Sequence, residues 1–292
     1  MVNYNLIDVV EEVTKKYFNT NKISIEFDDI NKEKTSTFSI SEIATHYKCK
    51  FRHKLIYIDG LYTFSQNINS MFGTIIHRCV QDYVTEKNLN PMFEFEIAMK
   101  QWIKENTNYG LNWSKENFIL PGLKMLKYFL DNKHKFDIFN NVNSIKPEYE
   151  VIYEYAKGIK LKGIIDLFIE KDGYYHIVDI KTKKNGFSIY EKRDKMLYYQ
   201  LTLYKYLIHK KYNIPLNKIK TYFMIMKKER VKKNIVELME VKVGNVRIKN
   251  FITTFNNFLM DLKNKNYQPR PTEFNCTYCN VKQYCQYKLK FS

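Results

Sequence analysis

The sequence contains little proline and glycine, and it lacks any long apolar run. Six prolines and nine glycines among 292 residues are too few for a collagen-like or disordered chain. No run of about 18 apolar residues occurs, which predicts no membrane-spanning helix and no membrane partner. The N-terminus is amphipathic, contains acids and lacks the basic-then-apolar order of a secretory signal. We therefore expect an intracellular, cytoplasmic protein.

Cysteine is scarce as well, with five residues. Because thiols stay reduced inside cells, a disulfide framework is not expected. Cys276, Cys279 and Cys285 stand within ten residues of one another, which is typical of a metal site. A closed four-thiolate site needs one more ligand, and the candidates are Cys49 and Cys79. Cys79 falls on the apolar stripe of an expected helix and is interpreted as a core thiol, which favours Cys49; three free reactive thiols are the alternative.

The sequence is rich in apolar residues and in positive charge. Hydrophobic residues make up 45% of it and aromatic residues 16%, which is enough to bury a core. The formal net charge is +17, and such an excess favours a polyanionic partner because binding to phosphates releases counterions. The codon usage of an AT-rich genome also favours lysine, so charge alone leaves both explanations open.

Hydrophobic periodicity predicts helices on either side of a small mixed sheet, which indicates an α/β fold. Alternation typical of strands begins near residue 148 and continues through Gly and Asp-Gly turns. We expect a capped helix with a turn at Cys49 within 39–60. Further helices are expected at 70–87, through most of 92–140 with a break at Pro121-Gly122, at 192–212 and at 244–267, where prolines 269 and 271 end the last one; strands are expected at 219–229 and 234–243.

These patterns divide the chain into four expected segments. Residues 1–36 form an N-terminal extension without an assigned role, and 37–147 form a helical part. Residues 148–267 form the core, and 268–292 form a cysteine-rich tail. No internal repeat and no low-complexity linker is present.

Residues 163–184, GIIDLFIEKDGYYHIVDIKTKK, are expected to form a hairpin that carries charged groups among apolar residues. If Asp172 and Gly173 are the centre of a type I′ turn, cross-strand partners have residue numbers that sum to 345. Asp166 then faces Asp179, about 5 Å away at Cβ. Lys181 shares the face of Asp179 because strand side chains alternate.

Two ionised carboxylates at this distance repel each other unless a positive group lies between them. A Mg²⁺ ion suits the pair, because it binds through one or two carboxylates and keeps water and phosphate as its other ligands. Such an ion activates water and stabilises phosphate charge, so the hairpin predicts a metal-dependent phosphodiester hydrolase. The alternative is an exposed strand face with ordinary acids and a lysine. Glu148, Glu150 and Glu154 are further acids on the preceding strand, and Glu150 is a candidate for the metal site.

The order of these residues resembles the PD-(D/E)XK nuclease superfamily, and within it the RecB-like branch. FGTIIH resembles the G-x-x-x-H motif of that branch, and YYQLTLYKY resembles its Q-x-x-x-Y motif. The resemblance implies a restriction-endonuclease-like core. It also implies that His77, Asp166, Asp179 and the carbonyl of Ile180 bind Mg²⁺ or Mn²⁺, that Lys181 is catalytic, and that Gln200 and Tyr204 organise the site or the DNA.

The cysteine spacing is similar to that of the iron–sulfur relatives in this branch, which include the AddB helicase–nuclease subunit and the CRISPR-adaptation exonucleases. This likeness implies a [4Fe–4S] cluster held by Cys49, Cys276, Cys279 and Cys285, which would form a C-terminal cap tied to the N-terminal helical part. Zn²⁺ also accepts four cysteines, so the residues alone leave both open. The resemblance covers about 40–290; no helicase motif is present, and 1–36 has no counterpart.

Two basic runs follow the predicted catalytic centre. One contains Lys181, Lys183, Lys184, Lys192, Arg193 and Lys195, and the other contains Lys227, Lys228, Arg230, Lys232 and Lys233. Tyrosines interleave with both, a combination that suits single-stranded nucleic acid; a solvated face is the alternative. No helix-turn-helix or zinc finger is evident, so sequence-specific recognition is not expected.

The function predicted from these features is a DNA exonuclease that acts on ends or single strands. Recombination, repair, phage DNA processing and CRISPR adaptation are the candidate processes, and a recombination, helicase or CRISPR-adaptation protein is the candidate partner. A module that binds DNA ends without cutting is one alternative. An endonuclease with flap, structure or RNA preference is the other.

Overall fold

The structure is a computed structural model that describes residues 36–61, 67–87, 90–106, 115–228 and 234–289. The chain divides into two compact units. We call Met1–Thr63, Ile152–Gly163 and Ile248–Ser292 the cysteine unit, and Phe64–Val151 with Ile164–Arg247 the sheet unit. Of the predicted N-terminal extension, all but Ser36 lies outside the described residues. Among the helices that the structure describes, none is both long and apolar enough to cross a membrane.

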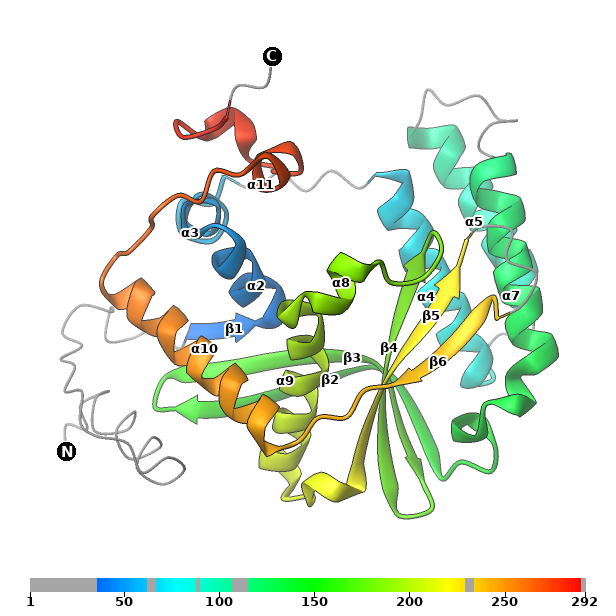
Figure 1. Cartoon of the computed structure of the whole chain (residues 1–292). Coiled ribbons are helices and arrows are strands. Elements are labelled where there is room, and N and C mark those ends of the chain that lie inside the picture. The colour runs from blue at the N-terminus through cyan, green and yellow to red at the C-terminus, as the bar shows by residue number, and fades with distance from the viewer. Residues whose placement is uncertain (1–35, 62–66, 88–89, 107–114, 229–233, 290–292) are drawn as a thin grey trace. The chain divides into compact units, whose positions relative to one another are not determined.

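The strands form one mixed sheet with the order β1-β3-β4-β5-β6, in which β2 also pairs with β3 (Figure 1). β3 and β4 are antiparallel, β4 and β5 are parallel, and β5 and β6 are antiparallel. The bounds are β1 Ser36–Ser39, β2 Ser144–Ala156, β3 Ile159–Lys171, β4 Tyr174–Lys183, β5 Ile219–Lys227 and β6 Val236–Glu240. This confirms the predicted mixed sheet flanked by helices, although β2 begins at Ser144 rather than near 148 and the short strand β1 was not predicted.

The hairpin between β3 and β4 has the predicted register. Lys171 pairs with Tyr174 and Leu167 pairs with Val178, so partner numbers sum to 345. Asp172 and Gly173 have φ values of 50° and 71°, as both central residues of a type I′ turn require. The turn sequence therefore determines which residues of the two strands face each other.

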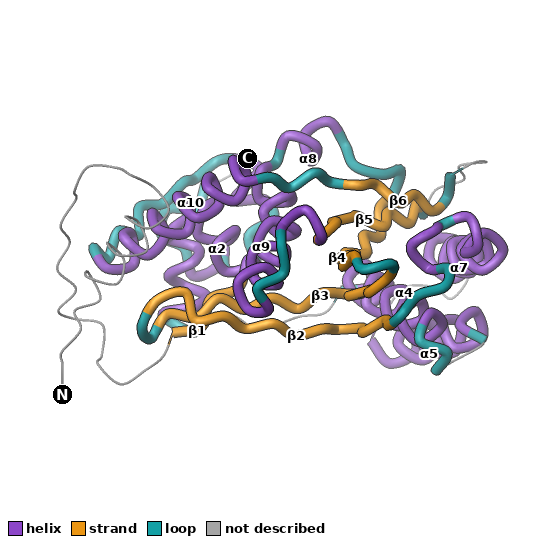
Figure 2. The backbone as a smooth tube through the Cα atoms, turned by 90° about the horizontal axis from the view of Figure 1, so that it is seen from below, coloured by secondary structure: helices purple, strands orange, loops and turns teal. Residues whose placement is uncertain are grey.

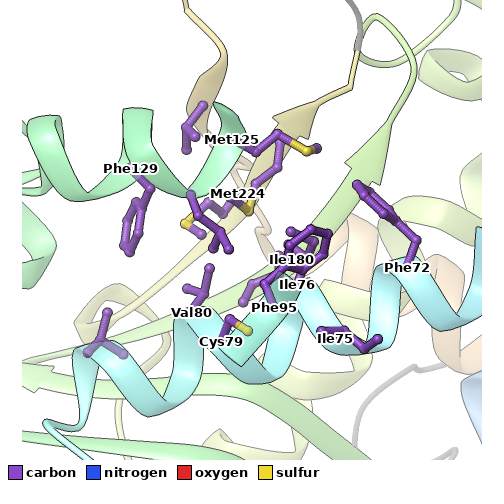
Figure 3. Close-up of a cluster of buried hydrophobic side chains, with 14 of the residues drawn as sticks. Phe72, Ile75, Ile76, Cys79, Val80, Phe95, Met125, Phe129, Ile180 and Met224 are labelled. Carbon is purple, nitrogen blue, oxygen red and sulfur yellow. The ribbon is translucent and has the colours of Figure 1, made fainter. Parts of the chain in front are cut away.

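One face of the sheet is covered by α4 (Ile68–Val84), α5 (Pro91–Asn106) and α7 (Leu120–Asn132). The predicted row of apolar side chains on α4 packs against this face of the sheet, together with Ile180 of β4 and Met224 of β5 (Figure 3). Cys79 is fully buried in this core, and burial raises the pKa of its thiol to about 12, as suits a core thiol. Short π and 3-10 turns link the helices at Lys115–Ile119, Lys133–Lys135 and Asp137–Phe139.

The expected break at Pro121-Gly122 is wrong, because Pro121 lies in the first turn of α7. Proline is tolerated there since that N–H has no partner within the helix. Gly122 is instead needed for packing. A Cβ at this position would lie 2.0 Å from the ring of Phe95 on α5.

The other face of the sheet carries α8 (Ile189–Arg193) and α9 (Lys195–Tyr212), as Figure 2 shows. Alternation along β5 separates the faces: Phe223 contacts Phe187, whereas Met224 belongs to the core under α4. The helix expected at 192–212 begins at Lys195, because the side chain of Asp194 accepts the N–H of Met196 and caps it. A 3-10 turn, Leu216–Lys218, leads into β5.

In the cysteine unit, Ser39 caps α2 (Ile40–Lys48), and extended backbone at Cys49 ends this helix, as predicted. The chain continues through α3 (Lys50–His53) and a π turn, Lys54–Ile58. His46 and Lys50 bind Asp261 of α10 (Asn245–Lys263) at 3.0 and 2.8 Å. α10 ends several residues before the prolines at 269 and 271, so those prolines do not end it. The tail contains α11 (Glu273–Thr277) and a 3-10 turn, Lys282–Tyr284.

Candidate active site

The site is built where β3 and β4 stop pairing. Their ladder ends at Leu167 and Val178, one step before Asp166 and Asp179. Beyond it, a carboxylate replaces the backbone partner, because Oδ2 of Asp166 accepts the N–H of Ile180 at 2.6 Å. Asp179 lies on the α9 face of β4 and is 1% exposed. The two acids are therefore held near each other with little access to water.

The surroundings of both acids disfavour their charged forms. Burial raises the pKa of Asp166 well above its usual value, and the charge of Asp179 raises it further. Burial also raises the pKa of Asp179, although the ammonium of Lys181 opposes this. Nζ of Lys181 lies 2.7 Å from Oδ2 of Asp179, whereas no group in the described part of the chain donates a hydrogen bond to Oδ1. A buried carboxylate with an unpaired oxygen is suited to a cation.

His77 reaches the same carboxylate from α4. Its Nδ1 lies 3.5 Å from Oδ2 of Asp166. Burial and the charge of Lys181 lower the pKa of His77 to about 4. A hydrogen bond to the backbone of Ile180 raises this pKa, but by less. The imidazole is therefore neutral near pH 7, which is the form that binds metals. A Cβ at Gly73 would lie 3.2 Å from Oγ1 of Thr182, so the glycine permits the close approach of α4 to β4.

Lys181, Gln200 and Tyr204 form a chain of hydrogen bonds on the α9 face of β4. Nζ of Lys181 donates to Oε1 of Gln200 at 3.0 Å, and Nε2 of Gln200 donates to the Tyr204 hydroxyl at 3.0 Å. Gln200 and Tyr204 are one helical turn apart and so lie on the same side of α9. Burial and the nearby carboxylates raise the pKa of Tyr204, which remains a neutral phenol. Because the amide oxygen of Gln200 accepts a hydrogen bond from the ammonium of Lys181, the orientation of the Gln200 amide is fixed. Lys181 thus lies between two partners, Gln200 and Asp179.

Sequence reasoning missed Gln81 and pointed to Glu150 rather than Glu148. Nε2 of Gln81, on α4, donates to Oε1 of Glu148 at 2.5 Å and to the carbonyl of Asp166 at 3.1 Å. Glu148 has a φ of 46°, which is rare for a residue other than glycine and is unexpected inside a strand. Such local distortions redirect side chains near active sites. The four-residue spacing of His77 and Gln81 was the available signal, since it places both on one side of a helix.

The acids and His77 do not yet form a complete coordination set. Within the described ranges, no three His, Cys, Asp or Glu side chains are arranged to hold a metal ion. The donor set nevertheless fits a hard divalent cation, because it combines two carboxylates, a neutral imidazole and a backbone carbonyl. The charge of such a cation would offset the repulsion between Asp166 and Asp179.

The model of the PD-(D/E)XK nuclease superfamily matches residues 37–286. The chain belongs to this superfamily. A solved structure from Eubacterium rectale, named "Putative exonuclease", is similar to it over 90% of this chain and 91% of that one, at 14% identity and a TM-score of 0.52. Another, SSO0001, matches over 82% and 96% at 17% identity and a TM-score of 0.36. No curated protein matches significantly. At these identities the first likeness concerns the fold alone.

In this nuclease-superfamily chain, the four predicted cluster cysteines line one pocket of the cysteine unit. Arg52, Arg270 and Asn275 line it with them. Burial raises the pKa of Cys285, and the negative charge that the other three cysteines carry as thiolates raises it further. The N–H of Arg270 donates to Sγ of Cys49 at 3.4 Å, and Nδ2 of Asn275 donates to the carbonyl of Lys48 at 3.0 Å. The fold thus brings together cysteines that are more than 200 residues apart in the sequence.

The two predicted basic runs differ in how their side chains are used. In the second run, Lys227 forms an ion pair with Glu237 at 2.8 Å. Lys228 lies over the ring of Phe118, with 3.4 Å from Nζ to the ring centroid, and burial lowers its pKa to about 8. These two cations are engaged within the fold of the nuclease domain; Arg230, Lys232 and Lys233 lie outside the described residues. In the first run, Lys184, Lys192, Arg193 and Lys195 are exposed.

Proposed function

We propose that this protein is a Mg²⁺- or Mn²⁺-dependent DNA nuclease that removes nucleotides from DNA ends. The observation that carries the proposal is the buried pair Asp166 and Asp179 with the ammonium of Lys181 beside it. His77, Asp166, Asp179 and the carbonyl of Ile180 would hold the cation. When bound, the cation would lower the pKa of a water molecule and stabilise charge on the phosphate.

The other residues of the site prepare this chemistry. Lys181 is positioned by Asp179 and Gln200, so that its third N–H group is available to orient water or a phosphate oxygen. Tyr204 holds Gln200 in turn. The His77 and Gln200–Tyr204 contacts support assignment to the RecB-like branch. This branch, a cytoplasmic location, and a process among recombination, repair, phage DNA processing and CRISPR adaptation are parts of the same proposal.

We further propose that Cys49, Cys276, Cys279 and Cys285 hold a [4Fe–4S] cluster. The shared pocket supports this, since all four thiols line it and two arginines can balance the charge of thiolates. When bound, the cluster would tie the tail to the segment around Cys49. The segment boundaries 36/37, 147/148 and 267/268 remain predictions.

Purification without air, followed by assays on end-labelled DNA, tests the function. We expect Mg²⁺ or Mn²⁺ to permit degradation of linear DNA and EDTA to abolish it, because the acids need a cation to act on phosphate. Circular single-stranded DNA should resist an enzyme that requires ends. Cutting of the circles would indicate an endonuclease, and binding without any cutting would indicate an end-binding module.

Glu148 provides a sharper test of the site. Replacing Glu148 by glutamine keeps the shape but removes the charge near Asp166, and we expect cutting to fall about 10- to 100-fold, as for residues that support metal ligands. Mn²⁺ affinity, measured by calorimetry on the same sample, should weaken as well. Glu150→Gln is the control on the same strand and should retain both properties. Equal losses in the two variants would assign no particular role to Glu148.

A further inference from the structure

The short helix α8 presents two neighbouring apolar side chains to solvent. Tyr190 is 86% exposed and Ile189 is 68% exposed. Phe187, two residues earlier, is instead buried and packs against Phe223, with 5.2 Å between ring centroids. The segment therefore has its own apolar anchor, and folding does not require the exposed pair.

α8 is held firmly despite its length. Ser188 and Glu191 form a reciprocal capping box, in which the Ser188 hydroxyl accepts the N–H of Glu191 and Glu191 accepts the N–H of Ser188. The carboxylate of Glu191 also forms an ion pair with Lys183 of β4. A rotation of α8 would break these contacts, so Tyr190 is displayed in a defined position.

In the sheet unit, α8 lies close to the proposed catalytic residues Lys181 and Gln200. The segment leaves β4 just after Lys181 and returns through α9, where Gln200 accepts a hydrogen bond from that same lysine. The ion pair of Lys183 with Glu191 joins α8 to β4 two residues beyond Lys181. Figure 1 shows α8 in the connection between β4 and α9, so a DNA strand with a phosphate at Lys181 would pass close to this helix.

The charge around α8 suits a polyanion. Residues 181–195 contain six lysines and arginines but two acids. Both acids are already used, Glu191 by Lys183 and Asp194 by the N–H of Met196. Lys192 and Arg193 lie two and three residues after Tyr190 and are exposed. An exposed ring beside cations is the combination that binds single strands, because bases stack on the ring while cations neutralise phosphates.

From this arrangement we infer that α8 is a docking site for single-stranded DNA. One base stacks on the ring of Tyr190 and contacts Ile189. Lys192 and Arg193 bind the adjoining phosphates. The inference rests on the proposed nuclease function and specifies the substrate as single-stranded DNA next to the cleaved bond. A duplex does not satisfy this site, since its bases are already stacked on each other.

The test measures binding in EDTA, without cutting, by fluorescence anisotropy with the full-length protein. Tyr190→Ala should weaken binding of a single-stranded oligonucleotide about tenfold and leave blunt duplex binding unchanged. Tyr190→Trp should retain affinity. Phe93→Ala, which removes a ring that is 62% exposed on α5, is the matched control and should behave as the wild type. The Lys192→Ala/Arg193→Ala variant should reduce the salt slope by about 1.4, because two phosphate contacts are lost.

An oligonucleotide with consecutive abasic positions identifies stacking directly. The wild type should bind it about tenfold more weakly than the normal strand, whereas Tyr190→Ala should not distinguish the two. The inference is overturned if Tyr190→Ala binds the normal single strand as tightly as the wild type does. It is also overturned if the substitution weakens binding of the abasic and the normal strand by the same factor. If the wild type cuts DNA while Tyr190→Ala binds normally, only the docking site fails. If Tyr190 proves necessary for binding but the wild type cuts nothing, only the nuclease function fails.

Discussion

Replacing Lys181 by alanine is expected to lower the rate of DNA cutting about 10³-fold or more, as the loss of a group that orients or protonates the reacting atoms does. Asp179→Asn should have an effect at least as large. This carboxylate both faces the proposed cation site and holds the ammonium of Lys181 at 2.7 Å. The measurement is the initial rate on end-labelled linear DNA with saturating Mg²⁺ or Mn²⁺.

Asp179→Asn should not unfold the protein. Burial raises the pKa of Asp179 and thus disfavours its charged form, so a neutral amide at this position removes an unfavourable buried charge. We expect the melting temperature of Asp179→Asn to equal or exceed that of the wild type without metal. Added Mn²⁺ should raise the melting temperature of the wild type alone. Asp131→Asn, at an exposed ion pair of α7, is the control for a lost surface carboxylate.

Retention of wild-type cutting by Lys181→Ala would contradict the proposed mechanism. Inactive variants that have also lost their thermal transition would not count as support, which is why the melting curve and the rate are measured on one sample. Stable, inactive variants would locate the defect in the chemistry.

Substitution of Cys276 by serine is expected to have the largest effect on stability. Structural metal centres held by cysteines contribute on the order of 10 kcal/mol to folding. Without the cluster, the tail would depend on individual contacts such as the hydrogen bonds of Asn275 with the carbonyl of Lys48 and of Arg52 with Asn280. We expect loss of the brown colour, of iron and of sulfide, and rapid trypsin cleavage in the tail.

Cys79→Ala is the matched control for this experiment. Cys79 is as deeply buried as any core residue, so its loss should cost about 1–3 kcal/mol of stability, but it lies outside the cysteine pocket and should leave the iron content unchanged. A colourless wild-type protein that contains only zinc after purification without air would contradict the cluster. Full cluster content in Cys49→Ser would show that the fourth ligand was wrongly chosen.

Local sequence patterns were sufficient to predict the structure where residues that are neighbours in the chain determine the backbone geometry. The Asp172-Gly173 turn determined the register of β3 and β4, because a two-residue loop with two positive φ values permits one alignment. The apolar spacing of α4 likewise predicted its buried face. The predicted helix break at Pro121-Gly122 was wrong because proline has two opposite roles, and only the ring of Phe95 shows why glycine is needed next to it.

By itself, then, the sequence determined the strand register, the residue order that identifies the superfamily and the cysteine spacing, since all three are fixed by positions along the chain. Tertiary structure alone decided that Glu148 is the acid beside Gln81, that Oδ2 of Asp166 replaces a backbone acceptor for Ile180, and that Lys227 and Lys228 serve the fold. It also decided that Tyr190 faces solvent. Such features depend on burial and on contacts between elements that are distant in the chain, for which the sequence carries no local signal.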